Sequence, residues 1–118
     1  MPGLSIHVVD VSRGIVATGM AVTVALLEAT RAPREIARGT IDAQGSLAVP
    51  ALGRRLERGT YEAAFAVADY YRTGGVLLPD QPFLDVVTYR FGIDDAEQHY
   101  HLPFKCTPWG YSCFRGGA

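Results

Sequence analysis

The residues of this chain best suited to acid–base chemistry are its three histidines. His99 and His101 lie two residues apart, and side chains two apart on an extended strand share one face. The pair could therefore meet one substrate or one metal ion. His7 lies near the amino end, on the polar side of an alternating segment. Because an imidazole titrates near neutral pH, one histidine could activate a water while another donates a proton.

A hairpin is predicted directly after the paired histidines. The sequence Thr107-Pro108-Trp109-Gly110 is typical of a turn, since proline suits the second position and glycine the last. A second strand is predicted from Tyr111 to Arg115, followed by the tail Gly116-Gly117-Ala118 with its free carboxylate. This hairpin would bring an imidazole, the Arg115 guanidinium and the terminal carboxylate within reach of one another.

The two cysteines lie on opposite arms of this hairpin. If residues 107–110 form the turn, Cys106 faces Tyr111 and Cys113 faces Phe104, so the two sulfurs are out of register for a disulfide. Free thiols are therefore predicted. They fit a reducing compartment.

Both ends of the chain carry motifs of a known family. The run HYHLP at 99–103, the run PWGYS at 108–112 and Phe114-Arg115-Gly116 are very similar to the C-terminal signature of the transthyretin-like 5-hydroxyisourate hydrolases. Residues 4–10, reading LSIHVVD, resemble the N-terminal signature of that family, and residues 19–24 resemble its next strand. The resemblance runs essentially from end to end.

This resemblance implies a hydrolase that opens 5-hydroxyisourate in urate catabolism, part of purine metabolism. Water would add to a cyclic amide carbonyl and the C–N bond would break without a cofactor. The resemblance makes His7 and His101 the catalytic residues, gives His99 a supporting position and makes Arg115 a substrate ligand. A planar guanidinium suits a urate-like anion with paired oxygen acceptors. The resemblance also implies a homotetramer, built as a dimer of dimers.

Three positions depart from the family pattern. Ser46 stands where the hydrolases usually have an arginine that binds substrate, Phe114 replaces a tyrosine, and Gly117 replaces a serine, with Ala118 extending the chain. Lys105 is in phase with His101 and could supply the missing cation. The residues expected to contact substrate are Arg115, Ser46, Lys105, His99, Phe114, Gly116 and Gly117.

These departures leave several functions open. A paralogue acting on a related lactam, hydantoin or ureide ring is one alternative. A non-catalytic small-molecule binder is another, because transthyretin itself is a carrier and a fold does not decide function. A metal-binding module using His7, His99 and His101 is a weaker alternative, since zinc usually takes three or four ligands. No metal and no cofactor is expected.

The remaining sequence predicts an all-β fold. Apolar and polar residues alternate over 4–9, 20–26, 61–67 and 83–91, with turn signals between these segments. Seven or eight short strands of this kind predict a β-sandwich. One brief helix is predicted over Ala68 to Gly74, and an exposed loop entering an edge strand over Glu28 to Arg38. The resemblance implies a transthyretin-like sandwich of two four-stranded sheets with that helix after the fifth strand.

Length and composition exclude several classes of protein. The 118 residues suit a single domain over 1–118, and 48% hydrophobic with 19% charged residues argues against disorder. A net charge of −1 does not indicate the basic surface that binds nucleic acid, so a small-molecule substrate is expected instead. The start MPGLS lacks the features of a secretory signal, and no stretch reaches the ~20 apolar residues that span a bilayer. A cytoplasmic protein without membrane association is predicted.

Overall fold

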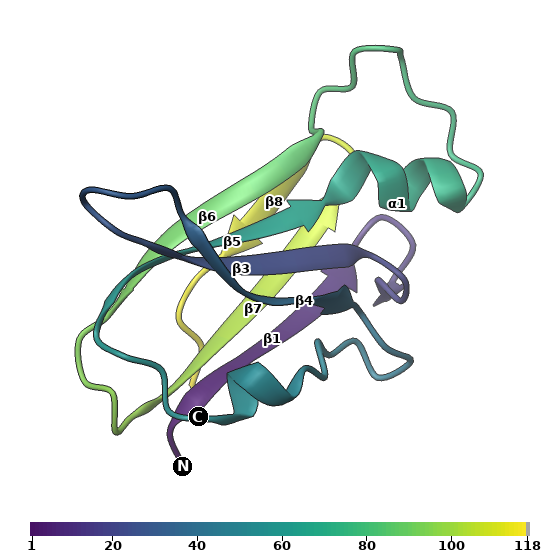
Figure 1. The fold of residues 1–118 in the computed structure, drawn as a ribbon. Helices are drawn as coiled ribbons and strands as arrows, with labels where there is room; N and C mark the ends of the chain where they lie inside the picture. The colour runs from purple at the N-terminus through teal and green to yellow at the C-terminus, as the bar shows by residue number, and fades with distance from the viewer. Residues whose placement is uncertain (118) are drawn as a thin grey trace.

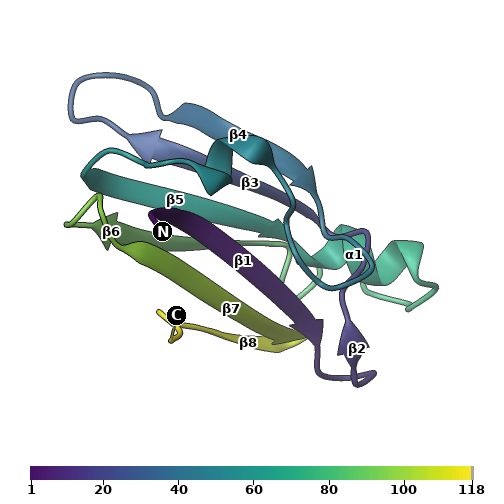
Figure 2. The ribbon, with the colours of Figure 1, turned by 90° about the horizontal axis from the view of Figure 1, so that it is seen from below.

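The chain folds into two four-stranded sheets, seen in a computed structural model that describes residues 1–117 (Figure 1). The first sheet has the order β2-β1-β7-β8 and the second β4-β3-β5-β6. Figure 2 shows the two sheets as separate layers, with the helix at one end of the sandwich. The strands of the first sheet are β1 (Gly3–Asp10), β2 (Ile15–Val16), β7 (His99–Thr107) and β8 (Gly110–Cys113). Those of the second are β3 (Ala21–Leu27), β4 (Arg34–Thr40), β5 (Gly59–Ala66) and β6 (Val86–Ile93).

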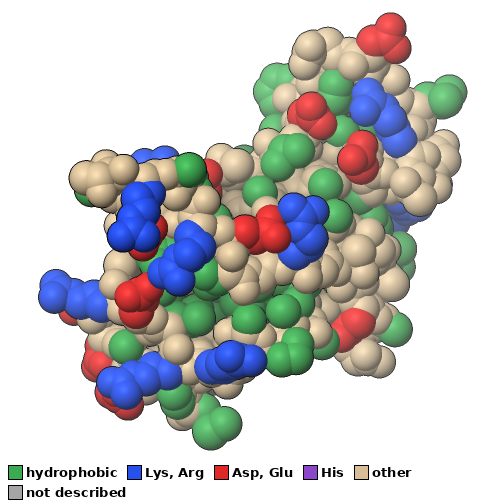
Figure 3. Space-filling view, viewed as in Figure 1, with side chains coloured by type: hydrophobic (Ala, Val, Ile, Leu, Met, Phe, Trp, Pro, Cys, Tyr) green, Lys and Arg blue, Asp and Glu red, His purple; other side chains and the backbone are tan. Residues whose placement is uncertain are grey.

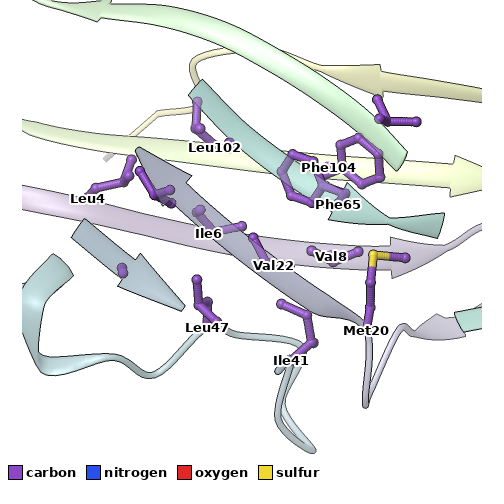
Figure 4. Packing of buried hydrophobic residues seen from close by; sticks show 14 of the residues in the cluster. Leu4, Ile6, Val8, Met20, Val22, Ile41, Leu47, Phe65, Leu102 and Phe104 are labelled. Atoms are coloured by element: carbon purple, nitrogen blue, oxygen red, sulfur yellow. The ribbon is translucent and has the colours of Figure 1, made fainter. Parts of the chain in front are cut away.

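The core lies between the sheets and follows the alternation of the strands. Leu4, Ile6 and Val8 of β1 are buried, while the residues between them are only half-buried. Across the core, the rings of Phe65 and Phe104 stack with centroids 3.9 Å apart (Figure 4). Burial of large apolar side chains at this density supplies most of the favourable free energy of folding. The predicted sandwich of two four-stranded sheets is confirmed.

The helix is also confirmed, and it follows the fifth strand. The α-helix α1 spans Val67–Thr73, and a short 3-10 helix η1 spans Pro50–Gly53. After α1 the chain turns at Gly75, whose φ of 86° lies in the region that glycine adopts without strain. No helix within residues 1–117 is long and apolar enough to cross a membrane.

Three predicted strand boundaries are wrong. Val67 belongs to α1 rather than to the strand before it, and the strand predicted from Phe83 begins only at Val86. These two boundaries have one cause. Ala66 is the last residue of β5 and pairs with Val86, so residues 83–85 have no partner in β5. At the carboxyl end, β8 stops at Cys113 instead of reaching Arg115. The ladder is interrupted there because Pro103 of β7 has no N–H to donate.

The exposed connection predicted over Glu28 to Arg38 ends earlier than expected. Its second half is the beginning of β4, which starts at Arg34 and forms an edge of its sheet, as predicted. The outer face over this sheet carries basic and acidic side chains interspersed with one another (Figure 3). Two of the ion pairs there are Arg38 with Glu35, at 2.7 Å, and Arg90 with Glu62, at 3.2 Å.

The hairpin has the predicted register. Thr107 pairs with Gly110, Cys106 with Tyr111 and Phe104 with Cys113. Cys106 and Cys113 are both free cysteines, as predicted. Burial raises the pKa of each thiol to about 11, so both are protonated and unreactive at neutral pH.

The two central strands of the first sheet join the ends of the chain. β1 pairs with β7 in parallel over eight successive positions, from Gly3 opposite His99 to Asp10 opposite Cys106. Within this ladder Ser5 lies opposite His101 and His7 opposite Pro103. The pairing therefore brings the amino-terminal histidine beside the two carboxyl-terminal ones.

A buried carboxylate fixes the far end of β1 to α1. Asp10 is fully buried and accepts hydrogen bonds from Ser12 at 2.6 Å, Tyr71 at 2.7 Å, Arg13 at 2.9 Å and Tyr70 at 3.0 Å. Burial alone would raise the pKa of Asp10, but the hydrogen bonds from Ser12, the two tyrosines and Arg13 hold it below its usual value. A charge that is buried and fully hydrogen-bonded in this way is a rigid anchor.

Candidate active site

The outward side of β1 and β7 carries all three histidines of the chain. We call this surface the histidine face and define it by Ser5, His7, His99, His101 and Lys105. The histidines and Ser5 are half-buried, whereas the alternate residues of both strands point into the core. The period of two along each strand, together with the parallel register, therefore sets this face.

Ser5 links the two histidines of β7. Its Oγ lies 2.8 Å from His99 Nε2 and 2.7 Å from His101 Nδ1. Both distances are those of well-formed hydrogen bonds. The link leaves Nε2 as the outer nitrogen of His101, and no hydrogen bond from residues 1–117 reaches it.

The His101 ring is predominantly neutral near pH 7. Burial lowers its pKa below the ordinary value, and the neighbouring imidazoles of His7 and His99 lower it further. A neutral ring with an unoccupied nitrogen can accept a proton from water. His101 is therefore suited to act as a general base.

The backbone fixes the tautomer of His7. Its Nε2 lies 3.0 Å from the carbonyl oxygen of Gln44. A carbonyl can only accept, so His7 Nε2 carries the proton and donates it, which leaves the lone pair on Nδ1. The N–H of His7 is thus engaged by Gln44, and the nitrogen left for a ligand is Nδ1 with its lone pair.

Gly45 is required where the turn approaches His7. Its φ is +86°, and a Cβ there would lie 2.6 Å from His7 Nε2. The turn is fixed to β1 by the N–H of Val8, which donates to the carbonyl of Gly45 at 2.9 Å. A side chain at this position would displace either the ring or the turn.

Ser46 follows directly and forms an isolated antiparallel bridge with His7. It lies beside the histidine face and brings only a small hydroxyl there. An open hollow of about 480 Å3 is lined by Ser5, Ser46, His99 and residues of the segment 47–53. His7 and His101 are not among the described residues that line this hollow.

The tail passes along the outer edge of β7. Gly116 N–H donates to the carbonyl of His101 at 2.7 Å. A Cβ at Gly116 would lie 2.9 Å from His101 Cδ2, so glycine lets the tail touch the ring. Gly117 follows and is exposed. The terminal carboxylate, expected near the histidines, belongs to Ala118 and lies outside the described residues.

Arg115 lies away from the histidine face. Its guanidinium lies over the ring of Tyr100, 4.0 Å from the centroid, and donates to Gln98 Oε1 at 3.1 Å and to the His99 carbonyl at 3.3 Å. The register explains this placement. Because Gly116 is opposite His101, Arg115 is opposite Leu102, a residue that points to the core side of the sheet.

Lys105 is the only lysine or arginine in the four strands of this sheet. It pairs with Val9, two positions beyond His7 on the same face. Its Nζ lies 5.9 Å from the centroid of the Phe114 ring, a distance compatible with a cation–π contact. Lys105 and Phe114 thus lie together at one end of the histidine face.

Within residues 1–117 no three histidine, cysteine or acidic side chains are grouped so that they could hold a metal ion. The hydroxyl of Ser5 lies between His99 and His101 instead. The arrangement favours acid–base chemistry over metal coordination among the described residues.

Three features of this site went unnoticed in the sequence: the Ser5 link, the Gln44 carbonyl and the need for Gly45. Ser5 had a readable signal, since it alternates in phase with His7. The carbonyl and the glycine belong to a turn whose approach to β1 is a tertiary contact, which local sequence does not encode.

A sandwich of two four-stranded sheets with one short helix is the architecture of a transthyretin-like protein, and three histidines lie on the outer side of one of its sheets. The model of the HIUase/Transthyretin family matches residues 4–116. The chain belongs to this family. It is 45% identical to the 5-hydroxyisourate hydrolase of Ralstonia nicotianae, covering 98% of this chain and 99% of that one. It is 44% identical to the 5-hydroxyisourate hydrolase of Deinococcus radiodurans, covering 98% and 96%.

Solved structures agree with this assignment. The Klebsiella pneumoniae 5-hydroxyisourate hydrolase superimposes with a TM-score of 0.77 at 26% identity, over 99% of this chain and 100% of that one. Sea bream transthyretin, solved in complex with thyroxine, superimposes with a TM-score of 0.82 at 24% identity, over 98% and 96%. The second likeness concerns the fold alone.

Proposed function

We propose that this protein hydrolyses 5-hydroxyisourate. The observation that carries the proposal is a pair of histidines on one face, each with a ring nitrogen that no hydrogen bond from residues 1–117 reaches: Nε2 of His101 and Nδ1 of His7. Such a nitrogen can accept a proton from water, and a ring that has accepted one can give it up again. The curated relatives named as 5-hydroxyisourate hydrolases support the choice of substrate.

In the proposed reaction His101 acts as the base. Its Nε2 removes a proton from a water while the water oxygen forms a bond to the cyclic amide carbonyl carbon. The carbonyl π electrons move to oxygen and give a tetrahedral oxyanion. As that oxyanion collapses, the C–N bond breaks, and the ring nitrogen takes a proton from an imidazole. His101, protonated at Nε2 in the first step, can supply this proton, and His7 Nδ1 can accept a hydrogen bond from the attacking water and orient it.

Substrate binding is proposed to involve the rest of the face. Ser46 and His99 line the hollow, and Lys105 supplies positive charge for a urate-like anion. Phe114, Gly116 and Gly117 are proposed to form the wall on the side of the tail. Arg115 stays a proposed ligand, and its role requires the guanidinium to leave the ring of Tyr100.

The family supports further proposals about the whole protein. We expect residues 1–118 to act as one domain, with both sheets sharing a core. We expect a homotetramer that works in urate degradation in the cytoplasm, on a small molecule and without a cofactor. Sedimentation of the purified protein tests the tetramer, and a monomer at micromolar concentration would contradict it.

A related substrate is the second candidate. Ser46 lacks the cation expected at its position, and Arg115 faces the other side of the sheet. Both observations favour a paralogue that opens a less charged lactam, hydantoin or ureide ring. A carrier that binds such a ring without turnover is the remaining possibility.

One experiment separates these functions. The purified protein is added to freshly generated 5-hydroxyisourate, with a chelator present, and the decay is followed by ultraviolet absorbance. We expect the decay to accelerate in proportion to enzyme concentration. A rate equal to the uncatalysed background, with turnover of another cyclic ureide, would favour the paralogue. Saturable binding with no turnover of either would favour the carrier.

A further inference from the structure

We propose that Ser5 and His99 form a proton relay. The relay sets the tautomer of His101 and, when His101 takes a proton from water, transfers a proton through Ser5 to His99. This inference rests on the proposed function and assigns roles to two residues that act through His101. Both are positioning residues in this scheme.

The Ser5 hydroxyl has one proton and lies against two ring nitrogens. It cannot donate to both. If both rings donated to Oγ, the hydroxyl proton would have no acceptor among residues 1–117, which is costly in a half-buried site. In the two remaining states Ser5 donates to one ring and accepts from the other.

These two states give His101 opposite chemistry. When Ser5 donates to His99 Nε2, it accepts from His101 Nδ1–H, and His101 Nε2 has a free lone pair. When Ser5 donates to His101 Nδ1, His101 must carry its proton on Nε2, and His99 Nε2–H donates to Ser5. The first state is a base ready for water, and the second is an acid ready for the leaving nitrogen.

One shift of protons converts the base into the acid. As an O–H bond of water breaks and N–H forms at His101 Nε2, the His101 Nδ1 proton moves to Ser5 Oγ. The original hydroxyl proton moves to His99 Nε2, so the positive charge ends on His99. His101 is then neutral with a proton on Nε2. When that proton passes to the ring nitrogen of the substrate, the reverse shift restores the first state.

The fold favours such a relay because the three groups are held rigidly. Ser5 and both histidines lie on the two central strands of the sheet, which pair over eight successive positions. His99 also lines the open hollow, and no hydrogen bond from residues 1–117 reaches its Nδ1. Nδ1 of His99 is therefore not engaged by residues 1–117 when Nε2 takes the relayed proton.

The kinetic test uses Ser5→Ala, with Ser5→Thr as the variant that keeps a hydroxyl. Removing the partner that fixes a catalytic histidine tautomer is costly, so kcat for Ser5→Ala should fall at least ~10-fold while Ser5→Thr recovers part of the loss. In mixtures of H2O and D2O, kcat should depend on deuterium fraction along a curve in the unmodified enzyme and along a straight line in Ser5→Ala. A straight line in both, or an unchanged kcat, would overturn the relay.

A double-mutant cycle gives a second, independent test of the relay. Ser5→Ala, His99→Ala and the double variant should have about the same kcat, because each breaks the same relay. Losses that multiply would mean separate structural roles and would overturn the proposal. Thr60→Val is the control, since it removes an exposed hydroxyl from β5 of the other sheet. Its kcat should stay unchanged.

A measurement without substrate keeps the relay separate from the proposed function. The 15N chemical shifts of the imidazoles report which ring nitrogen carries the proton. His101 should hold its proton on Nδ1 in the unmodified protein and lose this preference in Ser5→Ala. The same tautomer in both proteins would overturn the relay, even in an active enzyme. The predicted change in a protein that fails to open 5-hydroxyisourate would contradict the proposed function alone.

Discussion

Gly116 and His101 are paired across the outer edge of β7, with the glycine N–H donating to the histidine carbonyl at 2.7 Å. The tail thus touches the ring proposed as the base. We predict that Gly116→Ala lowers kcat about tenfold or more, because a new Cβ would lie 2.9 Å from His101 Cδ2 and displace the ring.

The control for this prediction is Gly92→Ala on β6 of the other sheet, where the nearest atom to the added Cβ is the Gly59 carbonyl oxygen at 4.0 Å. Steady-state kinetics on both variants, with circular dichroism to check the fold, decide the matter. Equal activity in Gly116→Ala and the unmodified enzyme would show that the tail does not position the ring.

Lys105 should contribute mainly to binding. We predict that Lys105→Met raises KM more than it lowers kcat, since an ammonium that holds substrate equally in the ground and transition states affects KM. Ser46→Arg should recover part of the lost affinity by restoring a bidentate donor beside His7. Unchanged kinetics in Lys105→Met would leave Lys105 as a surface residue resting on Phe114.

Asp10 should dominate the acid sensitivity of the fold. We predict that Asp10→Asn lowers the free energy of unfolding by roughly 3 kcal/mol, because it removes the charge that four donors share. Urea denaturation measures this loss. Asp69→Asn, an exposed carboxylate on α1, is the matched control and should differ little.

The pH dependence of stability follows from the same carboxylate. The pKa of Asp10 is lower in the folded than in the unfolded protein, so the unfolded chain binds more protons between the two values. The Asp10 contribution is therefore full above the unfolded value of about 3.9 and is lost as the pH falls through the lower folded value. This acid-dependent loss should be reduced in Asp10→Asn. An identical pH profile in both proteins would contradict the prediction.

The pH profile of activity should reflect His101. Because its pKa is lowered by burial and by the neighbouring His7 and His99, the neutral base persists to lower pH than for an exposed histidine. We predict that kcat/KM falls only below about pH 6.5, the ordinary histidine value. Titration of the His101 ring protons by NMR should give the same midpoint as the fall in kcat/KM. In His7→Gln this midpoint should be higher, because one neighbouring imidazole is removed. A midpoint above about 6.5 would contradict the lowered pKa.

Much of the fold could be predicted from the sequence because its signals are local. Alternation with period two defined β1, β3 and β5, and the proline and glycine of 107–110 fixed the hairpin register. That same register places Arg115 opposite Leu102, so its position away from His101 was readable but was overlooked. Alternation places Ser5 in phase with His7, but the hydrogen bonds from Ser5 to the two histidines of β7 were beyond such reasoning. They depend on parallel pairing between strands 94 residues apart in the chain.

The most direct test of the central claim is the turnover of freshly generated 5-hydroxyisourate by His101→Ala beside the unmodified enzyme. Loss of a general base commonly costs ~10²-fold or more, so kcat should fall by at least that factor while the circular dichroism spectrum is unchanged. His7→Ala should show a loss of similar size, and His99→Ala a smaller one. Turnover by a folded His101→Ala at the rate of the unmodified enzyme would contradict the assignment of His101 as the base.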